Sequence, residues 1–209
     1  VGKEKTQAGR IGDFSSKKLA KRIKDFGLDV GRLKTGTPAR LSGRTIDWQN
    51  IEMQEPDSKP TLFSFLHRRP FQRQISCGIT YTNQVTHDVI RKNIKKSAVF
   101  NGSITSNGPR YCPSIEDKVV RFEDKESHQV FLEPEGLNDD TVYPNGISTS
   151  LPADIQDVYI RSIKGLEGVK VIKYGYAVEY DFINPKSLKS SLELKKIDGL
   201  FLAGQINGT

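Results

Sequence analysis

The sequence has little of what marks several classes of protein. It holds 2 cysteines, Cys77 and Cys112, in 209 residues, which is too few for a disulfide-stabilised scaffold, and it lacks the Cys-x-x-Cys and His-x-x-x-His spacings of zinc sites. No run approaches the roughly 20 apolar residues that span a bilayer, and residues 1–5 have no apolar signal-peptide core. These absences predict a soluble, cytoplasmic protein with reduced thiols and no membrane partner.

The dinucleotide-binding fingerprint Gly-x-Gly-x-x-Gly is absent too, and with it the usual phosphate-binding helix. The chain begins at Val1 without an initiator Met and ends at Thr209, shortly after an apolar run at residues 200–203 that has the pattern of a buried strand. Strands of that type usually lead into a helix. We therefore expect both ends to be cuts through a longer protein.

Positive charge is concentrated at the start of the chain. Residues 1–40 carry 11 Lys and Arg against 4 Asp and Glu, so all of the net charge of +7 lies there. Such a segment suits the phosphates of a nucleotide or of RNA, because it attracts polyanions and releases their counterions. Taken alone, the charge favours a plain solvated surface.

Periodicity predicts a strand-rich chain with few helices. Basic amphipathic helices are expected at 17–26, ended by Gly27, and at 86–96, capped by Thr86. A further helix is expected at 153–163. Strands are expected at about 30–34, 61–66, 75–82, 119–122, 129–133, 169–173 and 176–180. This order predicts a mixed α/β architecture and argues against a helical bundle.

Cys112 is the candidate with reactive chemistry. Arg110 and Lys118 flank it in a turn between Pro109 and Pro113, and nearby cations lower a thiol pKa and favour the nucleophilic thiolate. A buried cysteine that only fills space fits the local sequence equally well. Cys77 stands in a strand-like run, so we expect its side chain to lie in a sheet core.

Other polar residues carry weaker signals. Glu116 and Asp117 could form an acid/base pair, but adjacent charges are more typical of a solvated loop. The histidines have no ligand spacing. A Gly-rich polar tip at residues 204–209 follows the apolar run, where open α/β sheets bind ligands. We expect this tip to contact a cofactor.

Seven uncommon strings occur together in one order: GRLKTGTP at 31–38, THDVIR at 86–91, GPRYCPSIEDK at 108–118, FLEPEG at 131–136, YPNGISTSL at 143–151, GYAVEYDF at 175–182 and GQINGT at 204–209. Together they closely resemble the glucose-inhibited division protein A family of flavoproteins, which modify the wobble uridine of certain tRNAs. The resemblance spans nearly the whole chain. It implies part of an FAD/NAD(P)-binding, Rossmann-like domain at 1–42 and 105–209, interrupted by an inserted strand-containing domain at 43–104.

The resemblance also assigns site residues. It places Gln205 on an FAD-contacting position and Ser16 on another, although Phe14 and Ser15 stand where the family commonly has prolines. Cys112 matches an essential cysteine. A segment assigned to NAD binding corresponds to Gly108, Pro109, Arg110, Tyr111, Cys112, Pro113, Ser114, Ile115, Glu116, Asp117, Lys118, Val119, Val120, Arg121 and Phe122.

The implied reaction adds an aminomethyl or carboxymethylaminomethyl group at C5 of the uridine. It uses NADH-reduced FAD, a one-carbon unit from methylenetetrahydrofolate and an amine donor. Addition of a nucleophile at C6 makes C5 carbanion-like, and Cys112 is the candidate, with a proton-transfer role equally compatible. The implied partners are tRNA, a second copy in a homodimer, and a tRNA-modification GTPase completing a heterotetramer.

Two alternatives remain. A folate- and FAD-dependent tRNA uridine methyltransferase shares the flavin architecture, although the GPRYCPSIEDK string and the long insertion argue against it. A non-catalytic RNA-binding or partner-binding module is the alternative from a different class.

Overall fold

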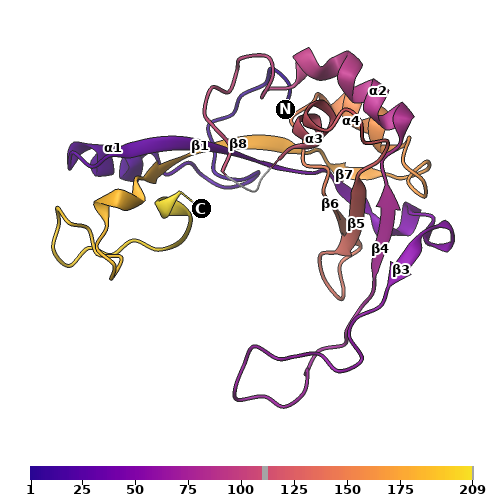
Figure 1. Ribbon diagram of the computed structural model, residues 1–209, viewed down its shortest axis with the longest axis horizontal. Coiled ribbons are helices and arrows are strands. Elements are labelled where there is room, and N and C mark those ends of the chain that lie inside the picture. The colour runs from indigo at the N-terminus through magenta and orange to yellow at the C-terminus, as the bar shows by residue number, and fades with distance from the viewer. Residues whose placement is uncertain (110–112, 209) are drawn as a thin grey trace.

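The computed structural model describes residues 1–109 and 113–208. Within them the chain forms two separate antiparallel sheets and a group of helices (Figure 1). The α-helices are α1 (Lys17–Asp25), α2 (Gln84–Asn93), α3 (Ile115–Arg121) and α4 (Ala153–Ile160). The strands are β1 (Val30–Thr37), β2 (Arg40–Ser42), β3 (Glu52–Gln54), β4 (Cys77–Tyr81), β5 (Gln129–Pro134), β6 (Thr141–Asn145), β7 (Val171–Lys173) and β8 (Tyr176–Ile183).

Strands β1 and β8 form a long two-stranded ribbon. They pair antiparallel over their full lengths, from Val30 opposite Ile183 to Thr37 opposite Tyr176. The other strands form a six-stranded sheet in the order β3-β4-β5-β6-β2-β7. Figure 1 shows α1 and the C-terminal residues at one end of the ribbon, with the larger sheet and the other helices toward the opposite end.

The chain passes between ribbon and sheet twice, at the two adjoining ends β1–β2 and β7–β8. Gly175 stands at the second crossing, where a Cβ atom would lie 2.7 Å from the carbonyl oxygen of Thr37. The buried Gln156 of α4 accepts a hydrogen bond from the Gly175 N–H at 2.7 Å and donates one to its carbonyl at 2.9 Å. A side chain larger than hydrogen is therefore excluded at this crossing.

The main core lies between the larger sheet and α2, α3 and α4. Alternate residues of β5 and β6 face inward, with Val130 and Leu132 fully buried, and meet Ile90, Ile115 and Tyr159 from the helices. Each fully buried aliphatic side chain contributes about 1.5–3 kcal/mol. This core contains residues from all three predicted segments, 1–42, 43–104 and 105–209. The predicted domain boundaries at 42/43 and 104/105 stay a prediction.

A second, much smaller core holds the other end of the ribbon. Ile183, Leu188 and Leu194 are its buried residues, and half-buried side chains such as Ile23 of α1 pack around them. Helix α1 buries none of its own residues, and Leu19 is 60% exposed. The basic face predicted for this helix is fully on the surface.

Most predicted elements are confirmed. The helices at 17–26 and 153–163 correspond to α1 and α4, the strands at 30–34, 75–82, 129–133, 169–173 and 176–180 to β1, β4, β5, β7 and β8, and the helix at 86–96 to α2 with a short 3-10 turn. The cap of α2 is Asn83 rather than Thr86, which occupies the third helical position of the capping box.

Three predicted strands are wrong. Residues 119–121 belong to helix α3 and Phe122 is its C-cap, because Ser114 and Asp117 form a capping box that starts a helix. Residues 61–66 are loop without a strand partner, between the chain-breaking Pro60 and Pro70. Residues 200–203 make one isolated bridge, and Phe201 is 58% exposed, so this run is not a buried strand.

Between β3 and β4, residues 58–76 leave the sheet as a long loop, here called the arm (Figure 1). It contains no helix or strand.

No helix within residues 1–109 and 113–208 is long and apolar enough to cross a membrane.

Candidate functional site

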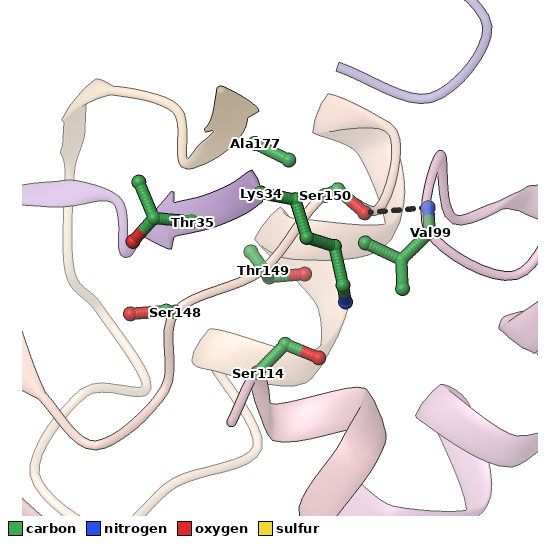
Figure 2. A pocket seen from close by; sticks show the side chains of 9 residues that line it. Lys34, Thr35, Val99, Ser114, Ser148, Thr149, Ser150 and Ala177 are labelled. Atoms are coloured by element: carbon green, nitrogen blue, oxygen red, sulfur yellow. Dashed lines mark hydrogen bonds between the residues drawn. The ribbon is translucent and has the colours of Figure 1, made fainter. Parts of the chain in front are cut away.

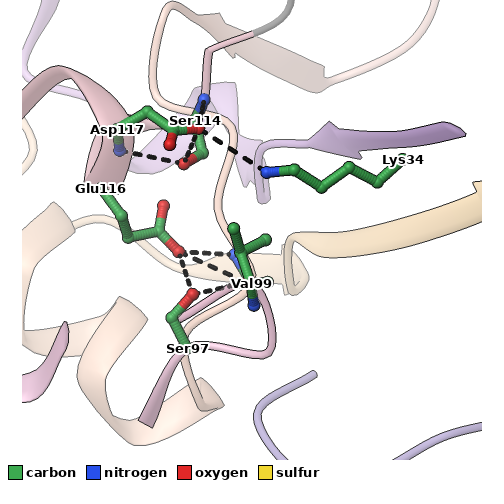
Figure 3. Close-up of polar contacts among 7 residues, drawn as sticks. Lys34, Ser97, Val99, Ser114, Glu116 and Asp117 are labelled. Atoms are coloured by element: carbon green, nitrogen blue, oxygen red, sulfur yellow. Dashed lines mark hydrogen bonds and ion pairs between the residues drawn. The ribbon is translucent and has the colours of Figure 1, made fainter. Parts of the chain in front are cut away.

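The segment that precedes and starts α3 is fixed by a capping box. The Ser114 hydroxyl accepts a hydrogen bond from the Asp117 N–H at 3.1 Å, and the Asp117 carboxylate accepts one from the Ser114 N–H at 3.1 Å. The Lys34 ammonium of β1 lies 3.8 Å from the same carboxylate (Figure 3). Asp117 therefore links the beginning of α3 to the ribbon.

Glu116 is fully buried, so the prediction of a solvated acidic loop is wrong for it. One carboxyl oxygen, Oε1, accepts hydrogen bonds from the Ser97 hydroxyl and the Ser150 N–H, both at 3.0 Å (Figure 3). The other, Oε2, has no partner among the described residues. Burial raises the pKa of Glu116 against the opposing effect of these hydrogen bonds, so the neutral acid is favoured.

The chain on the other side of Cys112 lies along the ribbon. Asn107 forms a parallel bridge with Leu33 and accepts a hydrogen bond from the Lys34 N–H at 2.9 Å. The Ser106 hydroxyl donates to Glu179 of β8 at 2.7 Å. Arg110, Tyr111 and Cys112 lie outside the described residues, but both flanks of this short stretch are placed against β1.

A small cavity separates β1 from the chain that follows β6 (Figure 2). Its volume is about 10 Å³, which is at the lower limit for one water molecule. It is lined by Lys34, Thr35, Gly36, Val99, Ser114, Ser148, Thr149, Ser150 and Ala177. A flavin or nucleotide does not fit inside this cavity.

The predicted cofactor tip forms a 3-10 turn at Gly204–Asn207 that packs against β8. Gln205 is exposed, and its carbonyl accepts a hydrogen bond from the Gly208 N–H at 3.0 Å. Gly208 has a φ of 83°, and a Cβ there would lie 2.7 Å from the Phe182 ring. The Oδ1 atom of Asn207 is buried and has no hydrogen-bond partner among the described residues.

The tip and the flanks of Cys112 therefore contact the same ribbon. The tip contacts Phe182 of β8, which pairs with Gly31 of β1. Asn107 is hydrogen-bonded to Lys34, three residues further along β1. That spacing corresponds to roughly 10 Å along a strand. Ser16 is exposed immediately before α1, where its side chain caps no backbone group.

The remaining residues of the predicted NAD segment divide between core and surface. Ile115 and Val119 are fully buried in the main core, and Lys118 donates a hydrogen bond to the Gly146 carbonyl at 2.7 Å. Burial lowers the pKa of Lys118. The residues exposed to solvent are Gly108, Pro113, Val120, Arg121 and Phe122, while Pro109 is half-buried.

The profile of one protein family, glucose inhibited division protein A, matches residues 1–209. The chain belongs to this family.

Similar proteins in the glucose inhibited division protein A family carry a common name. The tRNA uridine 5-carboxymethylaminomethyl modification enzymes MnmG of Granulibacter bethesdensis and Zymomonas mobilis are 56% and 52% identical over 208 residues. These alignments cover 100% of this chain and 33% and 34% of the relatives. The chain thus spans about a third of the length of the curated relatives it matches.

Two solved structures are also similar to this chain. Aquifex aeolicus GidA in the form I crystal has a TM-score of 0.90 and 49% identity, covering 100% of this chain and 36% of that one. The form II crystal gives 0.89 and 46%, with 34% of that chain covered. The predicted fold class, a mixed α/β chain with part of a Rossmann-like flavoprotein domain, is confirmed.

Cys77, the cysteine among the residues that the structure describes, is not an activated thiol. Cys77 lies on the less buried side of β4, opposite Gly78 and Thr80, which corrects its expected place in a sheet core. Burial and the Glu133 carboxylate both raise its thiol pKa. Among the described residues, no group of three or more His, Cys, Asp and Glu could hold a metal ion.

Sequence reasoning singled out Glu116 but took it for a solvated carboxylate, and it did not single out Lys34 or Asn207. The spacing of Ser114 and Asp117 was an available signal, because Ser-x-x-Asp is a capping-box pattern. Glu116 contacts Ser97 and Ser150, which are distant from it in the sequence, and no sequence pattern signals these contacts.

Proposed function

We propose that this chain is part of an enzyme that modifies C5 of the wobble uridine of tRNA, adding an aminomethyl or carboxymethylaminomethyl group. The observation that carries this proposal is the match of the whole chain, at 52–56% identity, to relatives named for that modification. Because the chain covers about a third of them, the complete activity belongs to the longer protein. Such an enzyme acts on tRNA in the cytoplasm.

FAD is the proposed cofactor, and the polar tip at Gly204–Asn207 is the part of this chain that fits it. Gln205 is exposed, and the buried Oδ1 of Asn207 has no partner among the described residues, so it is an acceptor available to a ligand donor. Gly208 lets the backbone pack directly on Phe182. Ser16 is proposed as a second contact from α1.

Bound FAD would supply the redox chemistry, with NADH as its reductant, and methylenetetrahydrofolate would supply the one-carbon unit. NADH is assigned to residues 108–122. In this segment the capping box of Ser114 and Asp117 and the buried Glu116 hold the start of α3 in place. They thereby fix the chain from Ser114 onward.

The proposed role of Cys112 is to activate the base. Its thiolate adds to C6 of uridine, forming a carbon–sulfur bond, and the electron pair of the C5–C6 double bond moves toward C5 and O4. C5 then attacks the methylene carbon, which breaks one of its two bonds to folate nitrogen, and C5 loses its proton to a base. The amine donor replaces the second folate nitrogen, so that tetrahydrofolate leaves. Departure of the thiolate restores the double bond. A role in that proton transfer is the second assignment compatible with the residue.

The proposed tRNA contacts include the basic helices. Lys17, Lys18, Lys21, Arg22 and Lys24 are all exposed on α1, and Lys92, Lys95 and Lys96 are exposed on α2 and the turn after it. Cations of this kind contact RNA phosphates. A homodimer and a GTPase partner completing a heterotetramer belong to the same proposal.

The experiment is Cys112→Ser in the native protein, purified with FAD and supplied with unmodified tRNA. We expect the modified nucleoside to disappear from digested tRNA while flavin absorbance and tRNA affinity stay at wild-type levels. Cys77→Ser is the matched control, because that thiol has a raised pKa, and it should keep activity. Full activity of Cys112→Ser would remove this residue from the reaction.

A further inference from the structure

The arm, residues 58–76, displays apolar rings in solvent. Phe63, Phe65 and Phe71 are 101%, 106% and 81% exposed, and Leu66 is 92% exposed. Scattered single apolar residues are normal on a protein surface, but several large ones within nine residues form a patch of the kind used for binding. The arm packs in neither of the two cores formed by the described residues.

Charge on the arm has one sign. Lys59, Arg68, Arg69 and Arg73 are exposed, and residues 58–76 contain no Asp or Glu. The ion pairs formed within the described part of the chain all lie elsewhere. Aromatic side chains and Arg are enriched in protein interfaces as well, but a run of exposed rings among several cations with no acidic side chain is the pattern of surfaces that bind single-stranded nucleic acid. The combination favours an RNA.

The loop also folds back on itself to make a hollow. Its volume is about 250 Å³, and its walls include Phe63, His67, Arg69, Phe71 and Gln72. The His67 and Phe71 rings are 5.9 Å apart, and the Ser64 hydroxyl lies 2.8 Å from Nδ1 of His67. Pockets for drug-sized ligands begin at about 300 Å³, so this one suits a single flat ring. Aromatic walls with amide and guanidinium groups at the edge match a nucleobase.

We propose that the arm binds unpaired nucleotides of the RNA substrate. Phe63 and Phe71 stack on a base, while Arg68, Arg69 and Arg73 contact the neighbouring phosphates. Bases inside a duplex are not accessible to such stacking, so the target is a single-stranded loop or end. The proposal rests on the proposed function, since the RNA is the tRNA of that reaction, but it concerns a surface separate from the segment that carries Cys112.

The test measures binding of an unmodified tRNA transcript to the native protein, by fluorescence anisotropy at several salt concentrations. Phe63→Leu with Phe71→Leu keeps apolar bulk but removes the ring faces, and should weaken binding about tenfold or more. Phe63→Tyr with Phe71→Tyr keeps the faces and should bind like wild type. Phe14→Leu is the matched control, because Phe14 is 98% exposed outside the arm.

A second measurement separates stacking from charge. Arg68→Gln with Arg69→Gln should reduce the slope of log K against log salt by about 1.5, whereas the Leu pair should leave the slope unchanged. Since all these side chains are exposed, every variant should melt within about a degree of wild type.

Equal tRNA affinity for wild type, the Leu pair and the Tyr pair would overturn the inference, as would equal losses for both pairs. Variants that bind tRNA normally but fail to assemble with another protein would assign the arm to a protein partner and overturn it too. In either case a wild type that still binds and modifies tRNA leaves the proposed function standing. If the wild-type protein does not bind tRNA, both this inference and the proposed function are wrong.

Discussion

The backbone N–H of Ser150 donates a hydrogen bond to the carboxyl of Glu116, and neither residue is accessible to solvent. This contact joins the start of α3 to the segment between β6 and α4, which lines the small cavity beside β1. The buried acid thereby ties together chain segments 34 residues apart.

The first prediction concerns the pH dependence that Glu116 imposes. Its pKa in the fold is raised above the ordinary 4.5, so above pH 4.5 the unfolded chain releases a proton that the folded chain keeps. Stability therefore falls as pH rises from 4.5 toward the folded-state pKa. Glu116→Gln has no proton to release, and its melting temperature relative to wild type should increase between pH 5 and pH 8.

The control for this measurement is Glu123→Gln, since Glu123 is exposed near the end of the same helix. It should give the same difference from wild type at both pH values. A Glu116→Gln variant whose difference from wild type does not change with pH would show that the acid is ionised in the fold.

The second prediction concerns two buried histidines. The rings of His87 and His128 are 5.2 Å apart, and the pKa of His128 is lowered to about 4, chiefly by burial and then by His87, Lys118 and Lys125. Below pH 6.5 the unfolded chain binds protons that the folded chain does not, so stability falls as pH drops from 6.5 toward 4. The loss should be about 1–3 kcal/mol.

Melting curves from pH 7 to pH 4.5 test this expectation. His128→Phe keeps a ring in the core and should melt with a shallower acid dependence than wild type. His67→Phe, on the exposed arm, should follow the wild-type curve. If His128→Phe loses stability with acid as steeply as wild type, His128 does not control this range.

The third prediction concerns the crossing between sheet and ribbon. A Cβ at Gly175 would lie 2.7 Å from the Thr37 carbonyl and 3.1 Å from the Ala39 nitrogen, both backbone atoms that cannot rotate away. Gly175→Ala should cost about 1–3 kcal/mol and lower the melting temperature by several degrees. Gly168→Ala, where a Cβ meets nothing within 4 Å, should melt within about a degree of wild type, and equal effects would contradict the prediction.

The fourth prediction concerns the isolated chain. Its 209 residues contain no Gly-x-Gly-x-x-Gly, so the backbone that would hold a dinucleotide phosphate is missing from them. Purified in the presence of excess FAD and then desalted, the chain should show no flavin absorbance near 450 nm. Stoichiometric flavin would mean that the tip at Gly204–Asn207 holds the cofactor without that motif.

Sequence patterns located most elements, because helical and alternating periodicity depend on local burial, as in α1 and β5. They failed where a local capping box was overlooked and where packing between distant segments decides burial. Residues 119–122 resemble a strand in composition, but the capping box at Ser114 places residues 119–121 in a helix. Residues 200–203 looked buried, yet the small core at that end of the ribbon leaves Phe201 exposed.

The candidate site was predictable only in part, for the same reason. The family strings identified the segment around Cys112 and the tip with Gln205. Contacts such as Glu116 with Ser97, or Lys34 with Asp117, join residues 19 and 83 positions apart. No local pattern records such pairs, and in the arm the sequence predicted a strand at 61–66 that the structure does not have.

Gln156 has a consequence for how the two sheets meet. At the end of β7 the chain leaves its strand partners, and the peptide groups of Gly175 would be stranded in the interior without hydrogen bonds. The side-chain amide of Gln156 accepts a hydrogen bond from the Gly175 N–H and donates one to the Gly175 carbonyl, as a neighbouring strand would. One helix side chain thus satisfies both backbone groups of Gly175 at the point where the sheet ends and the ribbon begins.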